Sequence, residues 1–258
     1  MRLMKRILSA AAVLALSASL LVGCSSGTAS SVPVSASSAA ESTVSSVEET
    51  ASSAVDENEA AAAQLLNDLT DSYQELWPVI LADEYKQTWL DDCTALVGED
   101  NAEAAFEKLS SMVTGDVYGE DAVKAYANGG GAYFCGFTNS LAILTFDGET
   151  STISGTDKDG NVLFSHTYHY IGMEPVRGLY EFESDDADSG EFTYFFLAPD
   201  TSAETYHIEF RYGSDAEALS QYDAGEYAYW LASGISTDCD QTMINNCIEL
   251  FCTENLAG

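Results

Sequence analysis

Basic residues are scarce in this sequence of 258 residues. Nine lysines and arginines stand against 42 aspartates and glutamates, and the formal net charge is −33. A chain this acidic repels phosphate backbones, so nucleic acid is excluded as a partner. The surplus of carboxylates concentrates cations near the protein surface, which supports cation handling without demonstrating it.

Motifs of catalysis are also missing. The sequence contains no Gly-x-Ser-x-Gly and no His-Glu-x-x-His, the patterns of hydrolytic serine and zinc sites. The three glycines at 129–131 precede a predicted strand, whereas a phosphate-binding loop needs a following helix. We therefore predict that the protein is not an enzyme.

The N-terminus has the charge order of a secretory signal. Three basic residues within the first six precede an apolar run over 7–23, which is too short for a spanning helix. The run ends in Leu21-Val22-Gly23-Cys24-Ser25, which resembles the lipobox of bacterial lipoproteins. The resemblance implies a signal peptide over 1–23, lipidation of Cys24, and anchoring at the extracytoplasmic face of a bacterial cell membrane.

Residues 25–62 are mostly Ser, Ala, Val, Thr and Glu, with one proline and no aromatic residue. Such a segment buries too little apolar surface to offset its chain entropy. We predict a disordered tether over 24–62 that begins at the lipidated Cys24. The remainder, 63–258, suits one compact domain.

With Cys24 lipidated, an odd number of cysteines is left: Cys93, Cys135, Cys239, Cys247 and Cys252. The last three are spaced by eight and five residues, too far apart for a compact thiolate metal site of the Cys-x-x-Cys kind. Buried free thiols are the expected state, and a single disulfide is the alternative.

Hydrophobic periodicity divides the domain into helical and strand regions. Between about 60 and 119, apolar residues recur every three or four positions and predict helices, with Pro78 kinking or splitting the first one. Short segments rich in aromatic and β-branched residues predict strands at 132–137, 141–147, 151–155, 162–170, 179–183, 192–198 and 205–212. Helices are predicted again from 215 and end with 242–251.

The segments between the predicted strands contain turn residues, as in Asp147-Gly148, Asp159-Gly160-Asn161 and Ser189-Gly190, which suit tight hairpins. Consecutive hairpins make an up-and-down meander that closes on itself and so removes exposed edges. The sequence therefore predicts an α+β protein, mainly β with flanking helices, built on an antiparallel up-and-down β-barrel.

The region 164–212 carries a more specific pattern. Residues 168–172 read Tyr-His-Tyr-Ile-Gly, residues 176–183 read Val-Arg-Gly-Leu-Tyr-Glu-Phe-Glu, and residues 206–208 read Tyr-His-Ile. In this order they resemble the Tyr-x-Tyr-x-Gly, Gly-Val-Arg-Phe-Leu-Phe-Glu and His-Phe-His-Ile-Phe segments of the ZinT (YodA-like) family. That family consists of zinc- and cadmium-binding extracytoplasmic proteins with a lipocalin-like (calycin) barrel. The resemblance implies such a barrel, zinc or another divalent cation as ligand, and a metal ABC importer as partner.

The sequence departs from the family at the metal ligands. Three histidines bind the metal in the family, and here only the last is retained, as His207. Thr205 stands at the second position, and the first falls on or near Asp200. Fewer histidines shift the preference of a site from zinc toward harder cations.

The strand 205–212 sorts its side chains by alternation. Thr205, His207, Glu209 and Arg211 share one face. If this face lines the barrel mouth, His207 and Glu209 project together, and Asp200 or Glu204 joins them from the preceding loop. One imidazole with carboxylates is an acceptable ligand set for zinc or manganese. The alternative is a solvated strand face on which Arg211 pairs with the acidic side chain.

The other two histidines, His166 and His169, are three residues apart and so lie on opposite faces of their strand. His169 is the candidate auxiliary ligand, and the alternative is a barrel histidine whose hydrogen bonds are already satisfied.

A second function class also fits the sequence. Aromatic residues are frequent in the predicted strands, among them Tyr168, Tyr170, Tyr194, Phe195 and Phe196. They would line the cavity of a lipocalin-like carrier for a small organic ligand, or they would simply pack as core. An envelope interaction module without a metal is a third alternative.

Overall fold

A computed structural model gives the fold and describes residues 57–257. The predicted signal peptide 1–23, Cys24 and most of the predicted tether 24–62 lie outside the described residues. Residues 57–68 are helical. This helix extends across the predicted boundary between the tether, which ends at 62, and the domain, which begins at 63. In the part of the chain described, no helix is both long and apolar enough to cross a membrane.

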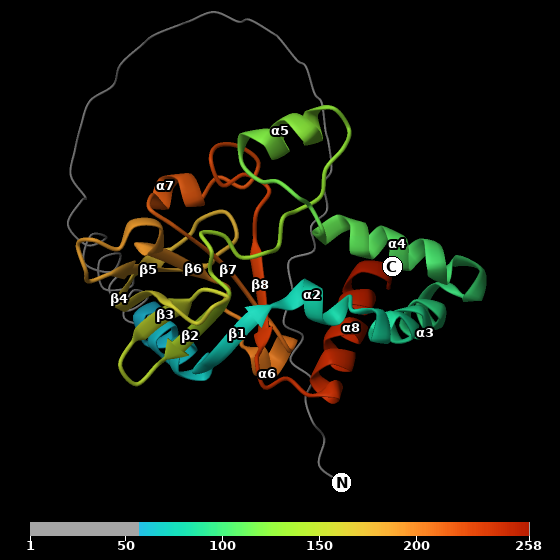
Figure 1. The fold of residues 1–258 in the computed structure, drawn as a ribbon, viewed down its shortest axis with the longest axis horizontal. Helices are drawn as coiled ribbons and strands as arrows, with labels where there is room; N and C mark the ends of the chain where they lie inside the picture. Colours follow the sequence, from blue (N-terminus) through green and yellow to red (C-terminus); the bar gives the residue numbers. More distant parts are fainter. Residues whose placement is uncertain (1–56, 258) are drawn as a thin grey trace, which may run out of the picture. The chain divides into compact units, whose positions relative to one another are not determined.

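Eight antiparallel strands close into a barrel in simple chain order, each pairing with the next and the last pairing with the first (Figure 1). They are β1 (Asp71–Glu75), β2 (Ile143–Asp147), β3 (Thr152–Thr156), β4 (Val162–Met173), β5 (Tyr180–Ser184), β6 (Tyr194–Leu197), β7 (Ile208–Gly213) and β8 (Ala232–Ser236). This confirms the predicted fold class, an up-and-down barrel with flanking helices. Closure gives every strand two neighbours, so no strand is left as an edge.

Helices come before and after most of the barrel strands along the chain, and they lie outside the barrel (Figure 1). Before β2 come α2 (Leu76–Ile80), α3 (Lys86–Val97), α4 (Glu99–Val113) and α5 (Glu120–Ala127), and after β8 comes α8 (Gln241–Leu256). Single turns α6 (Ser202–Thr205) and α7 (Ala216–Leu219) and the 3-10 turns η1 (Asp83–Tyr85) and η2 (Gly190–Phe192) lie within the connections.

Two hydrophobic cores share β8. The barrel interior is filled by aromatic and aliphatic side chains, with Ala232 of β8 among them. A second core lies between α2, α3, α4, α8 and the outer face of the barrel, and Ile235 of β8 belongs to it. Within this second core the indole Nε1 of Trp89 donates to the backbone oxygen of Ile80 over 2.7 Å. The helices are therefore packed onto the barrel wall, because β8 buries both of its faces.

The prediction missed the two strands that close the barrel. In β1, Tyr73 matches the three-to-four spacing of the apolar residues in the neighbouring helices, and the sequence therefore predicts a helix over 71–75. In the structure the side chain of Tyr73 lies in the barrel core. The strand β8 reads Ala-Ser-Gly-Ile-Ser and lacks the aromatic and β-branched pattern by which strands are recognised. The predicted strand 132–137 is wrong, since Phe134 makes only isolated bridges to Thr114 and Trp230.

Pro78 does not kink a long helix. It lies within the first turn of the short α2, where proline is tolerated because the backbone N–H groups of a first turn have no partner in the helix. The break that we predicted at Pro78 comes earlier, at β1.

The glycines of two predicted turns adopt the conformation that tight hairpins need. Gly160 has a φ of 81° and Gly190 a φ of 56°. Gly148 serves a different purpose, because a Cβ placed on it would lie 2.4 Å from the Cα of Asn67. The β2–β3 turn therefore packs directly against the backbone of the helix over 57–68.

We expect Gly148→Ala to lower the free energy of unfolding by about 1–3 kcal/mol, since the new methyl group would force the turn and the helix apart. Chemical denaturation measures the loss. Gly130→Ala is the matched control, because its nearest contact would be 3.7 Å away, and it should change stability by less than about 0.5 kcal/mol. Equal losses in both variants would contradict the role of this contact.

Candidate functional site

The outer wall of β7 carries the candidate residues. Alternate residues of β7 are buried in the barrel core, namely Ile208, Phe210 and Tyr212. Glu209 and Arg211 therefore point outward, and His207 directly precedes the strand. The predicted alternation holds for β7, and the polar face lies on the outside of the barrel.

Thr205 and Tyr206 are not part of this strand, contrary to the prediction. Thr205 ends the single turn α6, and Tyr206 follows it with a left-handed φ of 66°. The chain thus makes a tight reversal just before His207. This reversal brings the backbone oxygen of Thr205 next to the imidazole ring.

Two contacts orient His207. Its Nδ1 lies 2.7 Å from the backbone oxygen of Thr205, which can only accept a hydrogen bond, so Nδ1 carries a proton. Its Nε2 faces the carboxylate of Glu209, with 3.9 Å between Nε2 and Oε1. Metal-binding histidines are typically held in this way, with one ring nitrogen donating to an oxygen and the other free to ligate. The side chain of His207 is 17% exposed and that of Glu209 is 45% exposed, so solvent reaches the pair.

The two groups shift each other's protonation. Burial lowers the pKa of His207, but the Cys247 thiol and the Glu209 carboxylate outweigh burial and hold that pKa well above its ordinary value. Burial raises the pKa of Glu209, but the facing His207 ring with its charge and the charge of Arg177 outweigh burial, so that this pKa is lowered. These opposite shifts favour the protonated form of His207 and the ionised form of Glu209. The protonated imidazole carries a proton on Nε2 as well as on Nδ1. A cation that binds at Nε2 has to displace the Nε2 proton.

Cys247 of α8 approaches the ring from its other side. Its Sγ lies 3.8 Å from Nδ1 of His207, whereas Glu209 faces Nε2. The thiol is therefore not placed to share an ion with Nε2. The prediction did not include Cys247, because the two residues are 40 positions apart and only the packing of α8 brings them together.

Two further carboxylates belong to the same electrostatic environment. Burial raises the pKa of Asp200, Glu204 and Glu209 raise it further, and His207 opposes them. Burial also raises the pKa of Glu254, which lies on α8; His207 lowers it, and Glu209 and Asp200 raise it. Asp200, Glu209 and Glu254 thus repel one another around His207. We call these four residues the His207 cluster.

The His207 cluster is not a closed metal cage. Within residues 57–257, no three His, Cys, Asp or Glu side chains converge closely enough to hold an ion. His207 and Glu209 face each other with 3.9 Å between Nε2 and Oε1, whereas Asp200 and Glu254 act on this pair through their charge. The cluster contains three of the predicted site residues, and Glu254 is the member that the prediction lacked.

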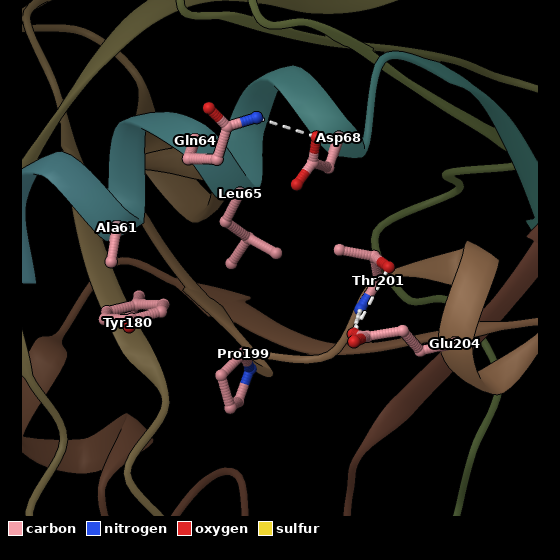
Figure 2. A pocket seen from close by; sticks show the side chains of 8 residues that line it. All are labelled: Ala61, Gln64, Leu65, Asp68, Tyr180, Pro199, Thr201 and Glu204. Atoms are coloured by element: carbon pink, nitrogen blue, oxygen red, sulfur yellow. Dashed lines mark hydrogen bonds between the residues drawn. The ribbon is translucent and has the colours of Figure 1, made fainter. Parts of the chain in front are cut away.

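Glu204 is held elsewhere. It closes a capping box at the start of α6, where the backbone N–H of Thr201 donates to its Oε2 over 3.3 Å (Figure 2). Glu204 also borders a pocket of about 320 Å³. Figure 2 shows its lining residues, Ala61, Gln64, Leu65, Asp68, Tyr180, Pro199, Thr201 and Glu204. The amide of Gln64 donates to Asp68 over 2.8 Å, so polar groups of this pocket bond to one another.

His169 is also separate from the cluster. Its Nδ1 lies 2.7 Å from Oδ1 of Asp185, while Nδ1 of His166 lies 2.7 Å from Oδ2 of Asp186. The His169 side chain is 52% exposed and that of His166 only 17%, in agreement with the predicted opposite faces. Over the described range, no hydrogen bond or ion pair joins His169 to His207. His166 and His169 instead hold the acidic turn between β5 and β6.

The alternative interpretation, in which Arg211 pairs with Glu209, is wrong. Arg211 is fully buried, donates to the backbone oxygens of Leu219 and Tyr227, and lies over the ring of Tyr222 at 4.4 Å. Burial lowers the pKa of this guanidinium. Arg211 therefore organises the connection between α7 and β8, and Glu209 is left to interact with His207.

The predicted strand aromatics act mainly as core. Phe195 and Phe196 are fully buried and Tyr168 is 3% exposed. Phe195 stacks on Tyr212 with 5.3 Å between ring centroids and meets Tyr168 edge-on at 5.4 Å. Side chains thus fill the barrel interior along these strands, as in small barrels generally.

The fold defines a class of protein, the closed eight-stranded antiparallel barrel with helices packed on its outer wall. No family model matches the chain, and no curated protein matches it. Among solved structures, the chain is similar to the Zn(II)-bound ZinT-like domain of Streptococcus pneumoniae AdcA, with 15% identity and a TM-score of 0.45 over 72% of this chain and 89% of that one.

A second similar structure is Zn(II)-bound AdcA from Streptococcus pneumoniae, with 14% identity and a TM-score of 0.43 over 70% of this chain. The chain spans 34% of that longer protein.

We expect Asp200→Asn and Glu254→Gln each to raise the melting temperature of the metal-free protein by about 1–3 °C, because each removes a repelled carboxylate from a partly exposed site. The pKa of both groups is raised on folding. The penalty is therefore present at neutral pH and disappears as the pH falls through the raised pKa values, so the advantage of the variants should shrink toward pH about 4.

Thermal melts at several pH values, after dialysis against a chelator, measure both effects. Glu103→Gln on α4 is the matched control, since it removes one exposed carboxylate far along the chain from the His207 cluster. If the control stabilises the protein as much as the cluster variants do, the gain reflects net charge and not local repulsion.

Proposed function

We propose that this chain is a membrane-anchored extracytoplasmic lipoprotein that binds a divalent cation of the zinc type at the His207 cluster. The observation that carries the proposal is the orientation of His207, whose Nδ1 is bonded to a backbone oxygen while Nε2 faces a carboxylate at 3.9 Å. The resemblance of residues 164–212 to the ZinT family agrees with it.

The distances suit one ion between the two side chains. Zinc binds nitrogen and carboxylate oxygen at about 2.0–2.2 Å in a tetrahedral site, which separates two ligand atoms by about 3.5 Å. A small rotation of Glu209 reaches that separation from the present 3.9 Å. Asp200 from the loop before α6 and Glu254 from α8 complete the set as they turn toward the ion.

The charges of the cluster favour a cation over a neutral ligand. Three carboxylates repel one another around a single imidazole, and a bound divalent cation relieves that repulsion. Carboxylate ligands also make the site harder than a set of three histidines, so zinc and manganese are both suitable ions. The strongly acidic chain raises the local cation concentration.

The two alternative functions receive less support. A carrier for an organic ligand needs a vacant barrel, whereas the described strands bury their aromatic side chains against one another. An envelope interaction module without a metal gives no reason for the orientation of His207 or for three carboxylates placed around it.

Anchoring and delivery complete the proposal. Acylation of Cys24 ties the chain to the bacterial membrane, and the segment between Cys24 and the helix over 57–68 is the tether that holds the barrel away from the headgroups, which an acidic surface avoids. Captured ions would pass to a metal ABC importer in the same membrane.

Isothermal titration of zinc into the purified chain, dialysed against a chelator, tests metal binding. We expect saturable binding at one site, weakened at least tenfold by His207→Ala, or by about 1.4 kcal/mol. His166→Ala is the matched control, because it removes an imidazole that is bonded to Asp186, and it should leave the affinity unchanged. Weak heat from many sites, the same in both variants, would show diffuse binding to the acidic surface and would sink the proposal.

Metabolic labelling with an alkyne fatty acid in a bacterial host tests the anchor. We expect the label on the wild-type chain and on Cys239→Ala, and none on Cys24→Ala, since only the lipobox cysteine is acylated. Labelling that survives in Cys24→Ala would contradict anchoring at this residue. The result is independent of metal binding.

A further inference from the structure

Two thiols from distant parts of the chain meet in the helical core. The Sγ atoms of Cys93 on α3 and Cys252 on α8 lie 3.9 Å apart, although the residues are separated by 159 positions. Both side chains are fully buried. Figure 1 shows α3 and α8 side by side where they meet.

We propose that Cys93 and Cys252 form a disulfide that ties α3 to α8 in the oxidised protein. Its presence in the cell rests on the proposed export, because disulfides persist in extracytoplasmic compartments. The sequence analysis gave a single disulfide as the alternative to free thiols, and this proposal names the two cysteines that form it.

The surrounding packing holds the two sulfur atoms together. Phe251, next to Cys252, meets Trp77 edge-on at 4.8 Å and Trp89 at 5.9 Å between ring centroids. Trp89 lies one helical turn before Cys93 on α3. Disulfide sulfurs are about 2.0 Å apart, so rotation of the two side chains has to shorten the present contact while the helices stay in place.

Two of the three remaining cysteines of the described residues have other neighbours. Cys247 contacts the imidazole of His207, and the sulfur of Cys135 lies 3.9 Å from the backbone oxygen of Tyr133. Between residues 57 and 257, Cys93 and Cys252 make the one thiol–thiol contact. The geometry therefore selects one pair.

The bond forms by exchange with an organic disulfide such as oxidised glutathione. One cysteine thiolate attacks the glutathione disulfide, releases one glutathione thiol and leaves a mixed disulfide. The second cysteine then attacks the mixed disulfide, forms the Cys93–Cys252 bond and releases the second thiol. Both cysteines are oxidised, the glutathione disulfide is reduced, and the two cysteine protons end on the released thiols.

Burial determines when this reaction takes place. It raises the pKa of the Cys93 thiol and that of the Cys252 thiol, so the folded, reduced protein presents few reactive thiolates. Exchange should therefore occur during folding, while the thiols are accessible, and be slow once the helical core has closed. The finished bond fixes α8 two residues before Glu254 of the His207 cluster.

Peptide mapping of the full chain tests the pairing. The protein is refolded in a glutathione redox buffer with a chelator present, free thiols are blocked, and a protease that cuts after glutamate is added. Such cleavage separates all five described cysteines except Cys239 and Cys247: Cys93 falls in residues 85–99 and Cys252 in residues 250–254. We expect these two peptides to be joined, and Cys135, Cys239 and Cys247 to carry the blocking group.

Variants and a stability measurement complete the experiment. Cys93→Ala and Cys252→Ala should each abolish the cross-link, whereas Cys239→Ala should retain it. The oxidised wild-type protein should melt about 5–10 °C above the reduced one, a comparison that needs no variant to fold. The proposal is overturned if all cysteines stay free after refolding or if the cross-link joins other cysteines. Because a chelator is present, neither result depends on metal binding.

Discussion

The pairing of β1 with β8 is the constraint on which the rest of the structure depends. It joins residues that are far apart in sequence, Tyr73 with Ser236 and Glu75 with Gly234, and Ser236 donates to the Asp71 carboxylate over 2.7 Å. Closure gives β8 two buried faces, so that Ala232 belongs to the barrel core and Ile235 to the helical core. The helices can pack on the barrel wall only because this strand is in place.

The helix α8 transmits that constraint to the site. It starts at an Asp240 cap that accepts from the backbone N–H of Met243, and it brings Cys247 to His207 and Glu254 to the carboxylates of the cluster. Burial and like charges raise the pKa of Asp200 and of Glu254 on folding, so the ionisation of these two groups at neutral pH opposes folding. Proteins commonly tolerate such local penalties at functional sites and offset them through packing elsewhere. Here the aromatic contacts of Phe251 with Trp77 and Trp89 hold the same helix.

Neither arginine of residues 57–257, Arg177 or Arg211, forms an ion pair with a carboxylate of the His207 cluster. The guanidinium of Arg211 donates hydrogen bonds to backbone oxygens of the α7–β8 connection. Arg177 lies over Tyr222 at 4.2 Å and lowers the pKa of Glu209 through its charge. The carboxylates around His207 therefore have no arginine bonded to them.

The sequence by itself determined the strands with strong local patterns, from β2 to β7, because alternation and turn residues act over a few neighbouring positions. It also placed Ile208, Phe210 and Tyr212 on one face, with Glu209 and Arg211 on the other. Only the tertiary structure decided that β1 and β8 are strands, that the polar face lies outside the barrel, and that Cys247 and Glu254 join His207. These features depend on contacts between distant residues, and the small side chains of β8 carry no local signal of the partner that makes them a strand.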